Sequence, residues 1–150
     1  MANNRNQSLA WLREQRNICI QEKITDYENP IRGIYGIFCG KDKKCAYIGK
    51  SVNIYSRMFK SDGHVTKMML GDHGIEAIRN AVLLKESISI EVLEDVEYVF
   101  DNYYKDMQRL ASRENYYIDQ YQAVDQCLEQ LPEGTTMTLC DWMKLKNGDS

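Results

Sequence analysis

Two short apolar runs separated by a polar insert constrain the fold of this chain more than any other feature. The first run, GIYGIFC, extends from Gly33 to Cys39, and the second, CAYIG, extends from Cys45 to Gly49. The segment between them, GKDKK, is polar, begins with glycine and has the length of a hairpin loop. We therefore expect two antiparallel strands joined by a tight turn.

Strict alternation along these strands predicts which side chains share a face of the sheet. The residues expected on one face are, on the first strand, Tyr35, Ile37 and Cys39 and, on the second, Cys45, Tyr47 and Gly49. Two tyrosines are thus expected near each other on one side of the hairpin. Ser51 follows as a candidate helix cap, and the helix that it starts would place Arg57 close to the hairpin.

The rest of the chain is predicted to supply helices and a third strand. Amphipathic helices are expected from Asn6 to about Glu22 and from Asp72 to Lys85, and a short helix is expected at residues 138–145. Alternation from Ser87 to Glu94 predicts a strand that pairs with the hairpin. The expected fold class is α+β, with a three-stranded antiparallel sheet flanked by helices.

The clearest helix signal runs from Asp101 to Leu131, with Asp101 or Asn102 as its cap and Pro132 as its stop. Glu114 interrupts the apolar face of this helix. A carboxylate on a buried helix face is costly unless it is paired. A structural ion pair with an arginine and a metal-binding or catalytic role both remain open for Glu114, and a basic, tyrosine-bearing neighbour favours the second role.

Charge is distributed unevenly along the chain. The formal net charge of −3 is unusual for a protein that binds nucleic-acid phosphates. Residues 31–70, however, hold eight basic and two acidic residues, whereas residues 86–133 hold twelve acidic and three basic ones. The acidic balance therefore hides one basic region, which coincides with the hairpin and the following helix. For Lys41, Lys43 and Lys44 alone, a solvated loop is the simpler explanation.

A chain of 150 residues is expected to form one domain. We place that domain at residues 31–131, with a helical extension at 1–30 and a short helical tail at 132–150. No apolar run is long enough to cross a bilayer, and the first residues lack a signal-peptide core, so a cytoplasmic protein without membrane contact is expected. The five cysteines show no zinc-binding spacing, which indicates free and mostly buried thiols.

The hairpin and the helix after it resemble the GIY-YIG nuclease family. The matching motifs are Gly33-Ile34-Tyr35, then Tyr47-Ile48-Gly49 after the loop, followed by Ser51, Asn53-Ile54 and Arg57. The match consists of several motifs at a set spacing, and the resemblance covers roughly residues 32–126. It implies a GIY-YIG nuclease-like domain.

The resemblance also implies roles for individual residues. Tyr35 and Tyr47 match the two motif tyrosines, of which we prefer Tyr35 as the general base, and Arg57 matches the arginine that holds the phosphate. Glu114 matches the glutamate that binds a single Mg²⁺ or Mn²⁺ ion. Lys50 resembles the lysine that follows the second motif in the repair incision nucleases. The implied reaction is endonucleolytic hydrolysis of DNA that leaves 5′-phosphate and 3′-hydroxyl ends.

These residue types suit that chemistry on physical grounds. A tyrosine serves as a base only where neighbouring cations favour its phenolate, and Lys50 and Arg57 can supply that field. The planar guanidinium of Arg57 can also clamp a phosphate. Glu114 can hold Mg²⁺ by one carboxylate oxygen, with water and phosphate as the remaining ligands.

Two positions depart from the family pattern. Many members carry a histidine or tyrosine one turn after the arginine, where this chain has Ser61. His64 lies one turn further and either replaces that residue or is an exposed loop histidine. Many members also place an asparagine beyond the glutamate helix, where this chain has Gln126. The candidate substrate-binding residues are Lys50, Arg57, Lys60, Lys41, Lys43, Lys44 and Gln126.

We therefore expect a DNA endonuclease, of a kind found in DNA repair, mobile elements or phages. The alternative is a catalytically silent nucleic-acid-binding or protein-interaction module with the same fold, favoured by the acidic net charge and the missing asparagine. No separate DNA-recognition module is expected, which leaves room for a homodimer or a partner protein that supplies recognition. Asp72 and His73 are assigned only to the start of a helix.

Overall fold

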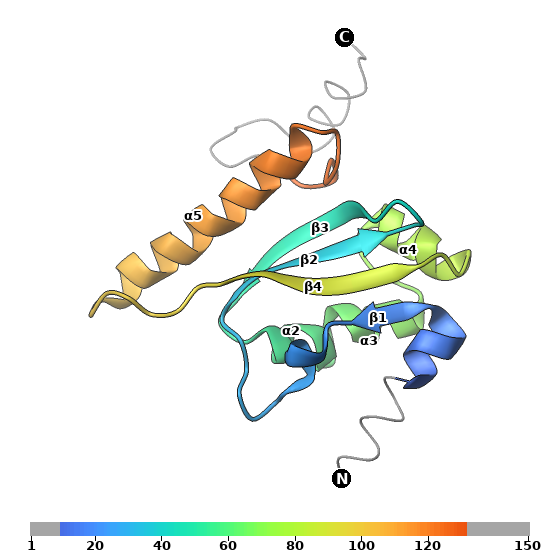
Figure 1. Cartoon of the computed structure of the whole chain (residues 1–150), viewed down its shortest axis with the longest axis horizontal. Coiled ribbons are helices and arrows are strands. Elements are labelled where there is room, and N and C mark those ends of the chain that lie inside the picture. Colours follow the sequence, from blue (N-terminus) through green and yellow to red (C-terminus); the bar gives the residue numbers. More distant parts are fainter. Residues whose placement is uncertain (1–9, 132–150) are drawn as a thin grey trace.

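The computed structural model describes residues 10–131 as a four-stranded sheet with helices on both sides (Figure 1). The strands are β1 (Ile18–Ile20), β2 (Gly33–Cys39), β3 (Lys44–Ser51) and β4 (Ile88–Asp95). The helices are α2 (Ile54–Phe59), α3 (His64–Leu70), α4 (Glu76–Leu83) and α5 (Tyr103–Gln122), with shorter helical turns at Leu12–Arg16 and Glu22–Thr25. The helix predicted at residues 138–145 lies outside the described residues.

The sheet is mixed, with the strand order β1-β4-β2-β3. β2 runs antiparallel to both β3 and β4, whereas β1 runs parallel to β4. The α+β class and the pairing of the third predicted strand with the hairpin are therefore confirmed. The three predicted strands pair antiparallel as expected, but the predicted three-stranded sheet is incomplete, because Ile18–Ile20 adds a fourth strand that runs parallel to β4.

This fourth strand comes from a segment predicted to be helical. The helical conformation ends at Asn17, whose φ of 59° is left-handed, a conformation that asparagine tolerates better than most residues. Ile18 and Ile20 are then buried, and Cys19 between them is exposed. Because burial alternates and isoleucine packs well on a sheet, a strand forms here. The predicted helix from Asn6 to Glu22 is therefore wrong beyond Arg16.

A β-bulge changes which hairpin side chains share a face. The partners across the hairpin are Tyr35 with Gly49, Ile37 with Tyr47, and Phe38 with Cys45. The register shifts after Ile37, which leaves Ala46 as the extra residue. Tyr35 and Tyr47 therefore share a face as predicted, whereas Cys45 points to the opposite side and packs in the other core.

Asn53, and not Ser51, caps α2. The side-chain oxygen of Asn53 accepts a hydrogen bond from the backbone N–H of Ser56 at 2.9 Å. The Ser51 hydroxyl instead accepts from the backbone N–H of Asn53 at 3.0 Å. The cap differs from the predicted one, but Arg57 still lies in the last turn of a helix that directly follows β3.

Two helices follow α2 where the sequence predicts one. α3 begins at His64, in a segment for which no helix is predicted, and α4 is shorter than the predicted helix at Asp72 to Lys85. Gly63 packs against the carbonyl of Met58 so closely that any side chain there would overlap it. This contact lets the chain turn sharply from α2 into α3.

α5 is capped by the side chain of Asn102, which accepts a hydrogen bond from the backbone N–H of Lys105 at 3.0 Å. The helix ends at Gln122, well before the predicted end at Leu131. The chain reverses there through left-handed residues, with φ of 63° at Asp125 and 57° at Cys127. The apolar residues beyond Gln122 continue at helical spacing, and for this reason the sequence predicted the end of the helix too late.

Two hydrophobic cores lie on opposite faces of the sheet. α5 covers one face, and α2 and α3 lie on the other (Figure 1). The core on the α2 side includes Tyr35, Ile37, Ile54, Met58, Val65, Met68 and Ile78. The core on the α5 side includes Ile34, Phe38, Ile48, Leu110 and Ile118. Since each fully buried side chain of this kind stabilises the fold by about 1.5–3 kcal/mol, the hairpin is held from both sides.

The segment after α5 covers the outer edge of β3. The side-chain amide of Gln130 donates to the carbonyl of Ile48 at 2.6 Å and accepts from the N–H of the same residue at 2.7 Å. Gln126 accepts from the backbone N–H of Cys45 at 2.6 Å. Exposed edge groups invite pairing with other chains, so these bonds protect the edge.

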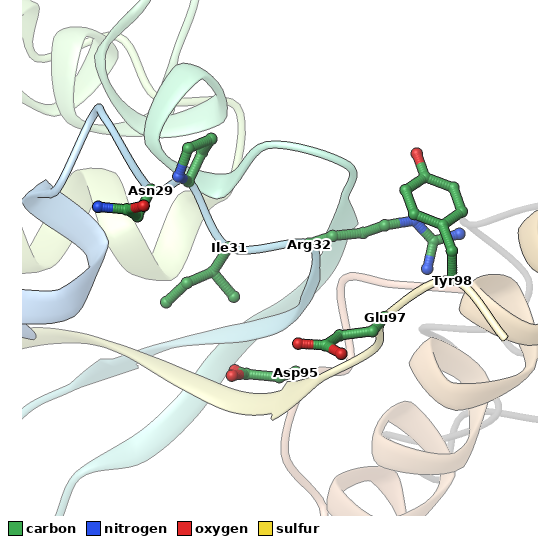
Figure 2. Close-up of a pocket in the computed structure, with 7 residues that line it drawn as sticks. Asn29, Ile31, Arg32, Asp95, Glu97 and Tyr98 are labelled. Carbon is green, nitrogen blue, oxygen red and sulfur yellow. The ribbon is translucent and has the colours of Figure 1, made fainter.

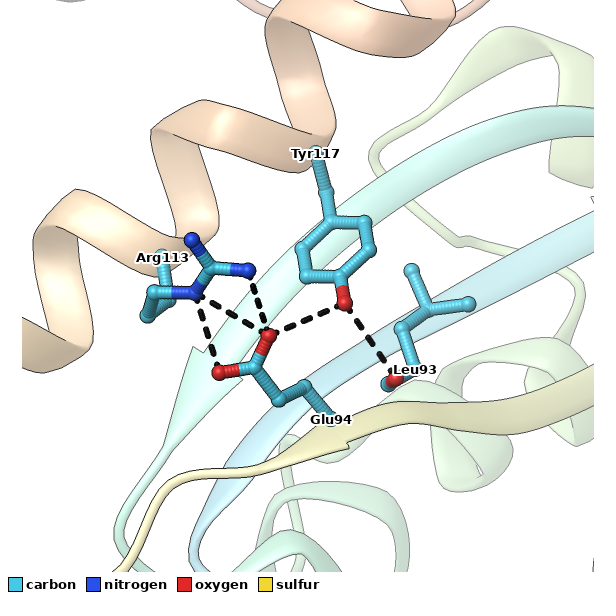
Figure 3. Close-up of polar contacts among 4 residues, drawn as sticks. All are labelled: Leu93, Glu94, Arg113 and Tyr117. Atoms are coloured by element: carbon cyan, nitrogen blue, oxygen red, sulfur yellow. Dashed lines mark hydrogen bonds and ion pairs between the residues drawn. The ribbon is translucent and has the colours of Figure 1, made fainter.

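Polar contacts around Glu94 fix α5 against β4 (Figure 3). Arg113 donates to both carboxylate oxygens of Glu94, through Nε at 3.0 and 2.9 Å and through Nη2 at 2.6 Å. The Tyr117 hydroxyl lies 3.0 Å from the same carboxylate and 3.4 Å from the carbonyl oxygen of Leu93. Because Arg113 directly precedes Glu114 in α5, this network also fixes where Glu114 lies above the sheet.

Candidate active site

Four side chains predicted to be catalytic lie together on the α2 side of the hairpin. We call Tyr35, Tyr47, Arg57 and His64 the tyrosine cluster. The ring centroids of Tyr35 and Tyr47 are 6.2 Å apart, and the His64 ring lies 5.4 Å from the first and 5.0 Å from the second. β2, β3, α2 and α3 each contribute one member, so residues from four elements converge on one point.

Tyr35 forms the buried centre of the tyrosine cluster. Its side chain is only 1% exposed, and its hydroxyl is hydrogen-bonded to Nε2 of His64 at 2.8 Å. Burial raises the pKa of Tyr35 well above its ordinary value, and Tyr47 raises it further. Arg57 lowers this pKa through its charge and through hydrogen bonding. Tyr35 is therefore a neutral phenol in the protein alone.

Arg57 faces both tyrosines from the last turn of α2. Burial alone would lower the pKa of its guanidinium, but Tyr35 and Tyr47 outweigh burial and raise it. Arg57 therefore stays charged beside two phenol groups. A planar cation in this position can bind the oxygens of a phosphate group.

His64 is buried, with an exposed fraction of 5%, so the alternative of an exposed loop histidine is wrong. Its Nδ1 lies 2.7 Å from Nε2 of His73, and Nδ1 of His73 accepts the backbone N–H of Ile75 at 3.0 Å. Burial, followed by the charge of Arg57, lowers the pKa of His64 to about 3. Burial and Lys67 lower that of His73 to about 4. Both rings are therefore neutral near neutral pH.

Lys50 and Glu114 form an ion pair on the other face of β3. Nζ of Lys50 lies 3.4 Å from Oε1 of Glu114, and the Glu114 side chain is 17% exposed. The partner of this carboxylate is thus a lysine, where the sequence suggested an arginine. Lys50 lies opposite Ile34, on the face that α5 covers. The pKa of Tyr35 is raised mainly by burial, and the charge of Glu114 contributes less in the same direction.

A single carboxylate, that of Glu114, limits which metal ions the site could bind. Within residues 10–131 there is no group of three or more His, Cys, Asp or Glu side chains arranged to hold a metal ion. One carboxylate fits a cation that keeps several waters and uses phosphate oxygens as further ligands, which is typical of Mg²⁺. It does not fit a structural zinc ion, which needs four protein ligands.

The predicted substrate-binding residues are spread more widely. Lys60 follows α2 and pairs with Asp62 at 3.6 Å. Lys41, Lys43 and Lys44 lie at the tip of the hairpin, roughly 13 Å or more along the strands from Tyr35 at about 3.3 Å per residue, and Lys43 pairs with Glu91 at 3.3 Å. The Gln126 side chain accepts its hydrogen bond from the edge of β3, at Cys45, and not from the tyrosine cluster.

A separate depression of about 460 Å³ lies where β2 begins and β4 ends (Figure 2). Arg32 is buried beside it, with its guanidinium 4.2 Å from the centre of the Tyr98 ring. The same guanidinium donates to the backbone carbonyls of Val96 and Asp106. The lining also contains two acidic residues, Asp95 and Glu97, and no member of the tyrosine cluster belongs to it.

Comparisons with protein-family models, with curated proteins and with solved structures gave no match. The residues of the site therefore carry the functional argument. In the part of the chain from residue 10 to residue 131, no helix has both the length and the apolar character needed to span a bilayer.

The sequence interpretation missed His73 as a member of the site. The chain has two histidines, and the structure places them in direct contact. His73 is 3% exposed, although it lies in a short connection between two helices. Its position before a predicted helix suggested only a structural role. No periodicity in the sequence indicates that α3 brings the two histidines together.

Proposed function

We propose that this protein is a metal-dependent endonuclease of the GIY-YIG type that hydrolyses phosphodiester bonds in DNA. The observation that carries the proposal is the convergence of Tyr35, Tyr47, Arg57 and His64 in one cluster whose centre, Tyr35, is buried. Each residue alone has an ordinary structural explanation. Four residues from four elements, two of them hydrogen-bonded to the Tyr35 oxygen and the third a neighbouring tyrosine ring, are better explained by a shared chemical task.

In the proposed reaction, Arg57 binds the non-bridging oxygens of the phosphate that is attacked. Tyr35 first releases its phenol proton to solvent, and Arg57 and His64 stabilise the resulting phenolate. The phenolate then takes the proton of the attacking water, while the 3′ oxygen leaves the phosphorus and is protonated by solvent. Tyr47 is half-buried and lies nearer to solvent than Tyr35, so it forms the wall against which the water is held. A positioned base and a phosphate clamp together supply orientation and charge stabilisation.

Glu114 is the proposed ligand of a single divalent cation. When bound, such a cation polarises the phosphate and adds positive charge near the tyrosines, which lowers the pKa of Tyr35. Lys50 holds the Glu114 carboxylate in place in the protein alone. On DNA binding, Lys50 exchanges this partner for a backbone phosphate.

Basic residues at the site support DNA as the substrate. Arg57 in the tyrosine cluster and Lys60 just after the same helix supply positive charge on one face of the hairpin, whereas Lys50 lies on the other face of β3. Lys41, Lys43 and Lys44 add positive charge at the far tip of the hairpin. Contacts of this kind bind the phosphate backbone without reading sequence. Binding is therefore expected to weaken steeply as salt concentration rises.

Incubation of the purified protein with plasmid and branched DNA tests the proposal. We expect cleavage in Mg²⁺, none in EDTA, products with 5′-phosphate and 3′-hydroxyl ends, and loss of cleavage in Glu114→Ala. Equal cleavage by wild type and Glu114→Ala would contradict the proposal. So would the absence of cleavage by both proteins across several substrates.

A second function, DNA or protein binding without turnover, is favoured by one observation. The Glu114 carboxylate is already paired with Lys50, and burial keeps Tyr35 a neutral phenol, so the protein alone presents neither an unpaired metal ligand nor a phenolate base. DNA binding that is unchanged by EDTA, together with no cutting in Mg²⁺, would favour this second function.

A further inference from the structure

A chain of hydrogen bonds leads from the start of α4 to the centre of the tyrosine cluster. The backbone N–H of Ile75 lies 3.0 Å from Nδ1 of His73. An amide N–H can only donate, so Nδ1 of His73 must accept and carries no proton. The proton of a neutral His73 ring is therefore on Nε2.

This assignment passes from one ring to the next. Nε2 of His73 faces Nδ1 of His64 at 2.7 Å, so its proton makes His73 the donor and leaves Nδ1 of His64 as the acceptor. The proton of a neutral His64 ring is then on Nε2, 2.8 Å from the Tyr35 oxygen. One backbone amide thereby sets the direction of every bond in the chain.

Both rings must be neutral for this direction to hold, and their surroundings keep them so. Burial is the main cause that lowers the pKa of each histidine. Arg57 and Lys67 act in the same direction on both rings. Arg79 donates to the backbone carbonyl of His73 at 2.7 Å, which holds the residue where Ile75 can reach it.

We propose that His73 is a positioning residue that locks His64 as a hydrogen-bond donor to the Tyr35 oxygen. This inference rests on the proposed function, because its purpose is to stabilise the phenolate form of the proposed base. It also excludes another role for His64, that of a base which removes the Tyr35 proton. With its Nε2 already protonated, His64 has no lone pair to offer to that proton.

The first test measures which ring nitrogens carry protons in the wild-type protein. Long-range ¹H–¹⁵N correlation spectra of the imidazoles distinguish the two neutral forms and need neither DNA nor activity. We expect both histidines to be neutral and protonated on Nε2 near neutral pH. A proton on Nδ1 of either ring would overturn the proposal.

Two substitutions of His73 separate positioning from packing. The amide nitrogen of His73→Gln can replace Nε2 as the donor to His64, whereas His73→Asn is too short to reach His64 and preserves only the acceptor for Ile75. For the Asn variant we expect a loss of up to about tenfold in kcat with little change in KM, which is the factor that corresponds to one lost hydrogen bond. The Gln variant should stay close to wild type, because it keeps that bond. Equal losses in both variants would contradict the proposal.

The substitution His64→Gln provides a second, independent comparison. The side-chain nitrogen that it introduces donates to Tyr35 whatever residue lies behind it. We therefore expect His73→Asn to reduce kcat in the wild-type background and to have no further effect in the His64→Gln background. If the two effects multiplied instead, His73 would act independently of His64 and the proposal would fail.

One readout separates this inference from the proposed function. The ¹³Cζ resonance of Tyr35 reports the hydrogen bonding of its oxygen in protein that cleaves nothing. It should shift in His73→Asn and stay unchanged in His73→Gln. If DNA cleavage were absent but this pattern held, the nuclease proposal would fail and the positioning role would stand. If the resonance responded equally to both substitutions, the positioning role would fail whatever the activity.

Discussion

The ring of Tyr35 packs directly against the backbone of Gly49, its partner across the β2–β3 pair. A Cβ at position 49 would overlap the hydroxyl end of that ring. The glycine is therefore required by the close approach of the tyrosine, and it sets the depth at which the phenol oxygen lies.

We expect Gly49→Ala to push the Tyr35 ring out of its place. Overpacking of this kind costs about 1–3 kcal/mol of unfolding free energy, and the proposed cleavage should be lost as well. Urea denaturation measures the first effect. Gly74→Ala is the matched control, because a Cβ at that position meets no atom within 4 Å, and wild-type stability in Gly49→Ala would contradict the packing described here.

The contact of Tyr117 with Glu94 predicts a pH-dependent loss of stability (Figure 3). Hydrogen bonding by Arg113 lowers the pKa of Glu94. A carboxylate with a lowered pKa stabilises the fold above its unfolded pKa, and that stabilisation is lost as pH falls through the folded value. Tyr117→Phe should cost about 1 kcal/mol near neutral pH and nearly nothing in acid.

Urea titrations at several pH values measure the effect of Tyr117→Phe. Tyr116→Phe is the control, since it removes a hydroxyl one residue away on an exposed side chain. A cost for Tyr117→Phe that persists unchanged in acid would show that Glu94 is not its source.

The two buried histidines predict that stability falls as pH drops below about 6.5, the ordinary histidine value. Their folded pKa values are about 3 and about 4, so the unfolded chain binds protons first, and each ring steepens the slope by up to about 1.4 kcal/mol per pH unit. The charges that act on both rings are Arg57 and Lys67, joined by Lys60 at His64 and by Arg79 and Glu129 at His73.

His73→Gln should therefore show a shallower decline than wild type between about pH 6.5 and 5, where carboxylates contribute little. Denaturant unfolding across that interval measures the difference. Identical slopes in the two proteins would mean that His73 is not held neutral in the fold.

The cysteines differ in their expected reactivity. Cys45 is buried and its Sγ lies 2.9 Å from that of Cys127; this contact, together with burial, raises the pKa of the Cys45 thiol. Burial also raises the pKa of Cys39 to about 11, whereas Cys19 is exposed. Since only the thiolate reacts, Cys19 should be alkylated at least about tenfold faster than Cys45. Peptide mapping after brief treatment with iodoacetamide checks the order, and faster labelling of Cys45 would contradict it.

Local sequence patterns predict the parts of the fold that depend on regular periodicity. The apolar runs of the hairpin, the alternation in β4 and the apolar face of α5 predict that these elements exist, although they do not predict where α5 ends. The contact between Tyr35 and Tyr47 follows from the same alternation, because both lie on one face of the hairpin.

Features set by tertiary contacts do not follow from spacing. β1 has three residues and is stabilised by pairing with β4, which comes much later in the chain. The bulge at Ala46 reverses the side of the sheet to which Cys45 points, and no residue type at that position predicts a bulge. α3 begins after a glycine that looks like a helix end, and this start is what brings His64 to Tyr35 and His73.

The rate of DNA cleavage in Mg²⁺, compared between wild type, Glu114→Gln and Asp119→Asn, tests the nuclease assignment most directly. Both substitutions remove one carboxylate charge from α5, but Asp119 is exposed, whereas Glu114 is the partner of Lys50. We predict that Glu114→Gln reduces the rate by at least about 100-fold while DNA binding persists, as expected for a catalytic group, and that Asp119→Asn cleaves at the wild-type rate. Equal rates in all three proteins, or no cleavage by any of them, would contradict the assignment.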